Sequence, residues 1–277
     1  MLPETNLATS QWLKDNLEDP KLIILYTNMD NPVTGQTDDK PVAFIPKSLF
    51  FDFENVFCDV DSSLPHTMPS QDCFNEEAIK LGINTDSIIV VYDNKGIYCA
   101  PRVWWMFKAM GHEQVYVLDG GLPVWLNQGL PTQPQLISAT KVGDFKGRFN
   151  NRCFTNADEI NKEPTNFTLL DARNEGRFNG TQAEPREGLR SGHIPNSINL
   201  PFDQCLDSTR LKPLEELKQI FAKLLLEPNK PLIFSCGSGV TACILALAAT
   251  QAGYTETSVY DGSWSEWGAR LELPVEL

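Results

Sequence analysis

The chain has 277 residues, of which 42% are hydrophobic and 21% are charged, and its formal net charge at pH 7 is −13. These proportions are typical of a globular protein with one large domain or two of ordinary size. The negative charge argues against nucleic acid as a partner, because nucleic-acid binding depends on clustered Lys and Arg that neutralise phosphates. The first residues show no basic start before an apolar segment, and no apolar run approaches about 18 residues, so we expect a cytoplasmic protein with no membrane partner.

Both halves of the chain alternate short apolar strands with helical patterns. This alternation predicts parallel sheets, because a parallel connection needs a crossover that is usually a helix. We therefore expect an α/β protein of two tandem domains, each a mostly parallel sheet with helices on both faces. The first predicted domain spans residues 1–135.

A polar stretch with two prolines, QGLPTQPQLISATKVGDFKGRFNN, follows the first domain. Proline and polar residues are typical of segments that connect domains. We predict a linker over residues 136–153 and a second domain over residues 154–277.

The second half contains a cysteine between a predicted strand and a predicted helix. The strand is KPLIFS, which follows the turn signal EPNK, and the helix is TACILALAATQAGY, which has a glycine near its end. Cys236 lies between the two, at the carboxyl end of the strand. In open α/β sheets this edge is where ligands bind.

The loop after Cys236, GSGVT, is suited to an anion. Its two glycines allow successive backbone N–H groups to point at one spot, and the N-terminus of the following helix adds partial positive charge. Because such surroundings lower the pKa of a thiol, the loop predicts a reactive thiolate at Cys236.

The chain has seven cysteines, and no two of them are spaced as C-x-x-C. A zinc knuckle or a redox dithiol is therefore not indicated. We expect most of the other six to be small buried apolar side chains. These six are Cys58, Cys73, Cys99, Cys153, Cys205 and Cys243.

Three segments of the first half are echoed in the second. VYVLDGGLPVWLNQGLP resembles TSVYDGSWSEWGARLELP, and FIPKSLFFD resembles HIPNSINLPF. In the third echo, Asp93 stands where the second half has Cys236. Repeats of this length are domains rather than solenoid units. We infer a catalytic second domain and a non-catalytic duplicate with Asp93 in place of the nucleophile.

The tandem halves, the segments GHIPNSIN and DGSWSEW, and above all CGSGVTA resemble the rhodanese superfamily, and specifically its 3-mercaptopyruvate sulfurtransferase branch. The resemblance implies two rhodanese-like domains and an enzyme that moves a sulfane sulfur from 3-mercaptopyruvate onto Cys236 as a persulfide, releasing pyruvate. It implies a small thiol, a thioredoxin-like protein or cyanide as the acceptor, and neither a metal nor an organic cofactor.

The resemblance also implies the residues of the site. Arginines in DARNEGRFNGTQAEPREGLRSGHIP match the positions that bind the substrate carboxylate, and an acid and a histidine from the first domain match a proton-handling set. The implied catalytic residues are Cys236, Ser238, His66 and Glu54. The implied substrate-binding residues are Arg177, Arg186, Gly237, Gly239, Val240 and Thr241, whereas Arg173 and Arg190 are expected to be structural.

Cysteine phosphatases use a similar arrangement of strand, loop and helix. A cysteine phosphatase needs an arginine at the end of its loop, where this chain has Ala242. Thiosulfate:cyanide sulfurtransferase is the alternative among enzymes, although its loop carries Arg or Lys where this chain has uncharged residues. A non-enzymatic sulfur carrier or regulatory rhodanese module also stays open.

Overall fold

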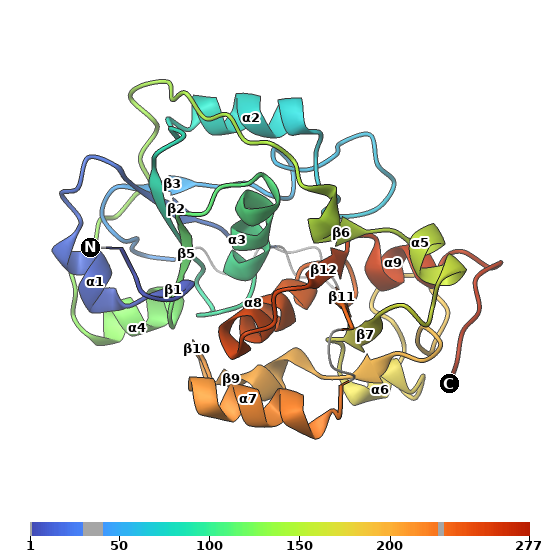
Figure 1. Ribbon diagram of the computed structural model, residues 1–277. Helices are drawn as coiled ribbons and strands as arrows, with labels where there is room; N and C mark the ends of the chain where they lie inside the picture. The colour runs from blue at the N-terminus through green and yellow to red at the C-terminus, as the bar shows by residue number, and fades with distance from the viewer. Residues whose placement is uncertain (1, 30–40, 227–229) are drawn as a thin grey trace.

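The computed structural model describes residues 2–29, 41–226 and 230–277, and these form two α/β units around two five-stranded sheets (Figure 1). The first sheet contains β1 (Leu7–Ala8), β2 (Leu22–Tyr26), β3 (Ser48–Phe50), β4 (Ile88–Tyr92) and β5 (Val115–Leu118). The second contains β6 (Phe154–Thr155), β7 (Thr168–Asp171), β8 (Ile198–Asn199), β11 (Leu232–Ser235) and β12 (Thr257–Tyr260).

The two sheets have the same topology. Their strand orders are β1-β5-β4-β2-β3 and β6-β12-β11-β7-β8, which is the same order once each unit is numbered by itself. Every pairing in both sheets is parallel. The duplication seen in the sequence is therefore a duplication of the fold.

Helices cover both faces of each sheet. In the first unit α1 (Ser10–Asp15) and α4 (Gly121–Asn127) lie on one face, and α2 (Gln71–Lys80) and α3 (Ala100–Ala109) on the other. Alternate strand residues supply the two cores, as Ile24 packs with α1 and α4 while Leu25 packs with α2 and α3.

The second unit repeats this arrangement. Here α5 (Ala157–Lys162) and α9 (Ser263–Trp267) cover one face, and α7 (Leu214–Lys223) and α8 (Ala242–Ala252) cover the other. The remaining elements are α6 (Glu175–Phe178), the 3-10 turns η1 (Asn151–Cys153) and η2 (Phe202–Cys205), and the antiparallel hairpin β9 (Leu206–Asp207) and β10 (Arg210–Leu211). The predicted fold class is confirmed.

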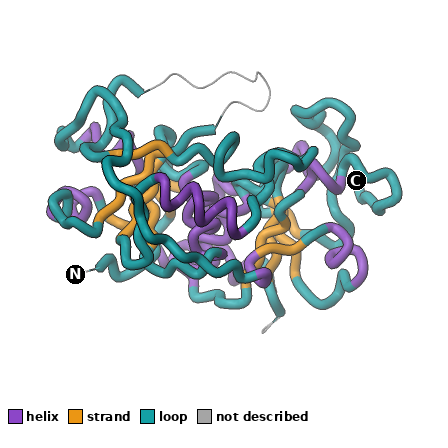
Figure 2. Tube along the Cα trace, turned by 90° about the horizontal axis from the view of Figure 1, so that it is seen from above, coloured by secondary structure: helices purple, strands orange, loops and turns teal. Residues whose placement is uncertain are grey.

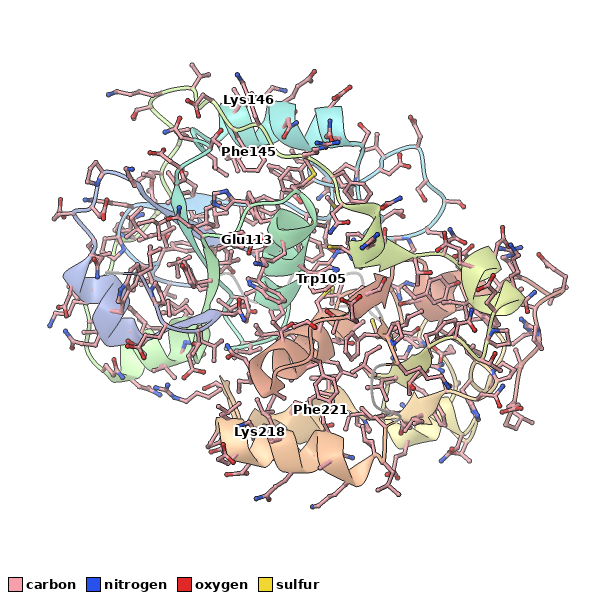
Figure 3. The ribbon with its side chains drawn as sticks, in the orientation of Figure 1. Trp105, Glu113, Phe145, Lys146, Lys218 and Phe221 are labelled. Carbon is pink, nitrogen blue, oxygen red and sulfur yellow. The ribbon has the colours of Figure 1, made fainter. Side chains whose placement is uncertain are left out.

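The two units share one hydrophobic core. Helices α3 and α8 pack against each other between the sheets, which lie on opposite sides of them (Figures 1 and 2). A single apolar cluster runs through both, from Trp104 of α3 to Leu245 of α8. Trp105 lies at the same junction, where its indole N–H donates to the Cys153 carbonyl at 3.0 Å (Figure 3).

The segment predicted as a linker, residues 136–153, runs along the first unit. The amide of Gly143 donates to the Ile79 carbonyl at 2.8 Å, and the amide of Arg148 donates to the Met110 carbonyl at 2.8 Å. Phe145 is 2% exposed and packs edge-on against Phe107 (Figure 3). The segment is thus fixed against the first sheet's helices.

The strand and helix predicted on either side of Cys236 are present. The apolar run becomes β11, and α8 ends at Gly253, whose φ of +101° supplies the left-handed cap that favours glycine. Residues 227–229, which belong to the predicted turn before the strand, lie outside the described residues. Within the described part of the chain, no helix is long and apolar enough to cross a membrane.

Candidate active site

Cys236 directly follows β11, at the carboxyl edge of the second sheet. It is 2% exposed, and the loop of Gly237, Ser238, Gly239, Val240 and Thr241 carries the chain from it into α8. Gly239 has a φ of +73°, and a Cβ at this position would lie 2.8 Å from the Asp261 carbonyl oxygen. Glycine is therefore required here on two counts, its backbone angle and its lack of a side chain.

Two serines of the DGSWSEW segment hold the loop in place. The Ser263 hydroxyl accepts hydrogen bonds from the amides of Cys236 and Gly239, both at 3.1 Å, and donates to the Tyr260 carbonyl. The Ser265 hydroxyl donates to the Gly237 carbonyl at 2.6 Å. Neither serine is among the predicted site residues, although their segment, DGSWSEW, is part of the resemblance to the rhodanese superfamily.

Several amides of the loop are left for a ligand. Within the described residues, the N–H groups of Gly237, Ser238, Val240, Thr241 and Ala242 donate no hydrogen bond to another protein group. These amides precede or open α8, whose dipole places partial positive charge at the same point. The loop can therefore stabilise an anion on or beside the Cys236 sulfur.

The matching loop of the first unit already contains an anion. Asp93 directly follows β4, and its carboxylate accepts hydrogen bonds from the amides of Tyr98, Cys99 and Ala100 at 2.9 to 3.0 Å. The loop is also closed by the other unit, because a Cβ on Gly96 would lie 2.4 Å from the Thr209 carbonyl oxygen. The first loop thus carries a carboxylate where the second carries the thiol of Cys236, and Thr209 of the other unit packs against it.

Ser238, His66 and Glu54 form one hydrogen-bonded chain across the two units. The Ser238 hydroxyl lies 3.1 Å from Nδ1 of His66, and Nε2 of His66 lies 3.0 Å from Oε1 of Glu54. The His66 side chain is 8% exposed and that of Glu54 is 21% exposed. An ionised Glu54 would accept a hydrogen bond from a protonated Nε2. Nδ1 would then carry no proton and could accept a hydrogen bond from the Ser238 hydroxyl.

Arg186 has no ion-pair partner among the residues that the structure describes. Its guanidinium is half-buried and makes no hydrogen bond or ion pair with the described residues, and burial lowers its pKa below the ordinary value. Electrostatic interactions with Cys236, Glu184 and Glu54 act on that pKa in the opposite direction. A half-buried guanidinium with no hydrogen bond or ion pair among the described residues is suited to bind an anion.

Arg177 is placed differently from Arg186. Its Nη2 lies 2.5 Å from Oε2 of Glu184, and its Nε donates to the same carboxylate. A Cβ added to Gly237 would lie 3.0 Å from that Nη2, so the guanidinium lies against the loop. The structure therefore brings Arg177 to the loop, where the carboxylate of Glu184 already binds it.

Arg173 and Arg190 have structural contacts. Arg173 is 2% exposed and binds Asp171 and Glu184, so Glu184 joins it to Arg177. Arg190 donates to four backbone carbonyls around α9. In the described part of the chain, no group of three or more His, Cys, Asp and Glu side chains is arranged to hold a metal ion.

The family model of the rhodanese-like domain matches the chain twice, over residues 9–128 and 156–270. The chain belongs to the rhodanese family. The predicted resemblance is thereby confirmed, and each of the two similar units corresponds to one rhodanese-like domain.

Among its rhodanese relatives, the chain is 40% identical over 295 residues to thiosulfate/3-mercaptopyruvate sulfurtransferase 1, mitochondrial, of Arabidopsis thaliana, with 98% of this chain and 78% of the relative covered. It is 37% identical over 275 residues to the 3-mercaptopyruvate sulfurtransferase of Escherichia coli K12, with 96% of each covered. Its structure is similar to that of SseA, a 3-mercaptopyruvate sulfotransferase from Escherichia coli, with a TM-score of 0.82, 33% identity, and 94% and 99% of the two chains covered.

Proposed function

We propose that this rhodanese-family protein is a 3-mercaptopyruvate sulfurtransferase in which Cys236 carries the sulfur as a persulfide. The observation that carries the proposal is the setting of Cys236. The cysteine lies at the head of a loop with unused amides, next to the Ser238–His66 pair and near the unpaired Arg186. The curated relatives support sulfur transfer from 3-mercaptopyruvate as the reaction.

In the first step, the Cys236 thiolate attacks the thiol sulfur of 3-mercaptopyruvate. A sulfur–sulfur bond forms and the bond from sulfur to C3 of the substrate breaks. The electron pair of that bond stays with the pyruvate fragment, which leaves as its enolate. The new persulfide anion is stabilised by the amides of the loop and the N-terminus of α8.

The enolate needs a proton at C3 to become pyruvate. The substrate thiol loses one proton as its sulfur joins Cys236, so the reaction balances if that proton is moved to C3. Ser238 stands in the same loop as Cys236 and is hydrogen-bonded to His66, which Glu54 supports from the far side. The hydrogen-bonded groups Ser238, His66 and Glu54 are suited to hold the proton and to deliver it to C3.

The substrate carboxylate is expected to bind the two arginines. Arg186 offers its whole guanidinium, whereas Arg177 has its Nη1 left over beside Glu184. Guanidinium groups match the geometry of a carboxylate, and the remaining loop residues Gly237, Gly239, Val240 and Thr241 shape the pocket around the reacting sulfur.

In the second step, a thiolate or cyanide attacks the outer sulfur of the persulfide, and Cys236 leaves as a thiolate. A small thiol, a thioredoxin-like protein and cyanide all fit this chemistry, so the physiological acceptor stays a prediction. The cytoplasmic location also stays a prediction, because relatives include both a mitochondrial and a bacterial enzyme. The domain boundaries at residues 135 and 154 likewise stay predictions.

Thiosulfate is the competing sulfur donor, since the name of the Arabidopsis relative includes both substrates. Thiosulfate is a small dianion, and residues 237–241 carry no charged side chain. The uncharged loop and the separate arginines favour a keto acid. Steady-state rates with 3-mercaptopyruvate and with thiosulfate, measured side by side on one preparation, test this choice. A larger kcat/KM for thiosulfate would reverse it, and no turnover with either donor would favour a non-enzymatic carrier.

A further inference from the structure

Arg102 is a fully buried arginine that reaches from the non-catalytic first unit to the site of the second. It lies on α3, is 0% exposed, and faces residues of the loop that follows Cys236. Burying a guanidinium is costly unless its charge is paired and its N–H groups are used. The contacts of Arg102 therefore indicate which segments its buried guanidinium holds in place.

These contacts converge on the segment that carries His66. Nη2 of Arg102 donates to the His66 carbonyl at 2.6 Å and lies 2.7 Å from Oδ1 of Asp261. Oδ2 of Asp261 accepts the Met68 amide at 2.7 Å. An arginine from one unit and an aspartate from the other thus bind the backbone of residues 66–68 from both ends.

The same arginine also touches the catalytic loop. Its Nη1 donates to the Gly239 carbonyl at 3.4 Å, so one side chain contacts both the loop of Ser238 and the loop of His66. The distance between these two loops determines whether the Ser238 hydroxyl can reach Nδ1 of His66.

His66 needs such support because its backbone is strained. Its φ is +62°, in the left-handed region that few residues other than glycine adopt. A strained residue keeps its conformation only when the surrounding contacts hold it there. If the carbonyl of His66 were released, the backbone would be free to relax and the imidazole would leave the line between Glu54 and Ser238.

We propose that the buried Arg102–Asp261 ion pair is a positioning device that holds His66 in line with Ser238. Docking of the two units, which buries this pair, thereby assembles the proton-handling chain. The inference rests on the proposed function for its kinetic consequence, but its structural consequence, the placement of His66, can be tested without any turnover.

The fold contains a second arginine–aspartate pair between the two units, more exposed on its arginine side, which serves as the control. Asp119 follows β5 as Asp261 follows β12, and it too binds an arginine of the other unit, Arg210, at 2.5 Å. This pair lies beside the loop of Asp93, since a Cβ on Gly120 would lie 3.2 Å from Arg210 and a Cβ on the next residue, Gly121, would lie 2.7 Å from the Asp93 carbonyl oxygen. Its removal weakens a contact between the units but leaves His66 untouched.

The test compares Arg102→Gln and Asp261→Asn with Arg210→Gln and Asp119→Asn in the full-length protein. Because a misplacement of about 1 Å can cost about a hundredfold in rate, we expect kcat for pyruvate formation to fall about tenfold to a hundredfold in the first two variants, with KM little changed. The control pair should keep the wild-type kcat. Equal losses in both pairs would mean that general loosening of the interface is responsible, and the proposal would be wrong.

A second measurement separates positioning from mere structural support. The chain has three histidines, so the imidazole nitrogen signals of His66 can be followed by NMR with His112 and His193 as internal references. In Asp261→Asn, which keeps an oxygen for the Met68 amide, the His66 signals should move while the other two stay. Unchanged His66 signals in this variant would overturn the proposal, even if Arg102→Gln does not fold or the protein forms no pyruvate.

The double variant with His66→Asn completes the design, because asparagine tolerates the left-handed backbone. If Arg102 acts through His66, adding Arg102→Gln or Asp261→Asn to His66→Asn should lower kcat by less than about twofold more. If kcat instead falls by a further tenfold to a hundredfold, Arg102 and Asp261 act on the reaction by a route that does not involve His66. A wild-type protein that forms no pyruvate would contradict the proposed function instead, and the NMR result would still decide the placement of His66.

Discussion

Asp93 and Cys236 occupy the same position in the two units, each directly after the central strand of its sheet and before a loop that leads into the helix at the interface. The Asp93 carboxylate accepts hydrogen bonds from four backbone amides of its loop and helix start. The first unit therefore displays, with a carboxylate, the anion binding that the second unit would give to a thiolate or persulfide.

The first prediction uses this equivalence. Cys236→Asp should place a carboxylate where the unused amides of the second loop can donate to it, as the amides of the first loop donate to Asp93. Hydrogen bonds to a charged group contribute about 1.5–3 kcal/mol each, against which the burial of the carboxylate must be set. We expect Cys236→Asp to unfold at a temperature at least a few degrees above Cys236→Ser while being equally inactive. Equal unfolding temperatures would mean that the second loop does not bind anions as the first does.

The second prediction concerns the nucleophile. Cys236→Ser should abolish sulfur transfer, and its intact mass should show no added sulfur after incubation with 3-mercaptopyruvate. Each of the other six cysteines, changed singly, should leave measurable transfer. A Cys236→Ser protein that still gains one sulfur would place the nucleophile elsewhere.

The third prediction separates Arg186 from Arg177 and Glu184. Loss of a charge-assisted contact costs about 1.5–3 kcal/mol, so Arg186→Leu should lower kcat/KM for 3-mercaptopyruvate about tenfold to a hundredfold. Because Arg186 has no partner among the described residues and burial lowers its pKa, its removal should leave the unfolding temperature unchanged or higher. An unaltered kcat/KM would exclude Arg186 from carboxylate binding.

Glu184→Gln should change stability in the opposite direction to Arg186→Leu. Its carboxylate is 1% exposed and pairs with both Arg173 and Arg177, so this variant should unfold at a lower temperature. Breaking one partner of a buried ion pair costs about 3–5 kcal/mol. A Glu184→Gln protein as stable as the wild type would show that the pair does not support the fold.

The fourth prediction is a change of donor preference through the loop. Ser238→Lys adds a cation near the reacting sulfur and removes the hydroxyl bound to His66, so kcat/KM for thiosulfate should rise relative to that for 3-mercaptopyruvate. Gly237→Arg is unsuitable for this purpose, because its Cβ would lie 3.0 Å from Nη2 of Arg177 and would bring two guanidinium groups together. Ser238→Ala is the control, since it removes the hydroxyl without adding charge. If Ser238→Lys and Ser238→Ala change the ratio equally, loop charge does not select the donor.

The fifth prediction concerns pH and the buried thiols. Burial raises the pKa of Cys205 and of Cys243 from 9.0 to about 12. Iodoacetamide at pH 8 should therefore leave both unmodified in the folded protein, because only about one thiol in ten thousand is ionised four units below its pKa. Peptide mapping after labelling checks this, with the urea-unfolded protein as the control.

The same two thiols make stability fall at alkaline pH. Their pKa is higher in the folded than in the unfolded chain, so the folded chain binds more protons between about pH 9 and about pH 12. Their contribution is complete below pH 9 and is lost as the pH rises toward 12. Urea unfolding of the wild type and of Cys205→Ala, Cys243→Ala should show a shallower alkaline loss in the double variant. Parallel losses would assign the effect to other groups.

The sequence by itself determined the features that depend on neighbouring residues. The strand, the two glycines and the helix around Cys236 are local patterns, because strand and helix periodicity and the conformational freedom of glycine act over a few residues. The duplicated topology was also accessible, since an echo at a fixed offset needs no knowledge of contacts. His66 and Glu54 were reached only through the resemblance, because nothing near them in the chain marks them as site residues.

Tertiary structure alone decided which groups meet. From the sequence, Arg177 and Arg186 are equally good candidates for binding the substrate carboxylate. In the fold, Arg177 pairs with buried Glu184, whereas Arg186 has no hydrogen bond or ion pair among the described residues. It also brings Ser263 to the amide of Cys236 and Arg102 to the carbonyl of His66. These contacts join residues far apart in the chain, and their energy depends on burial and on distances of a few ångströms. Those quantities exist only once the two units have packed together.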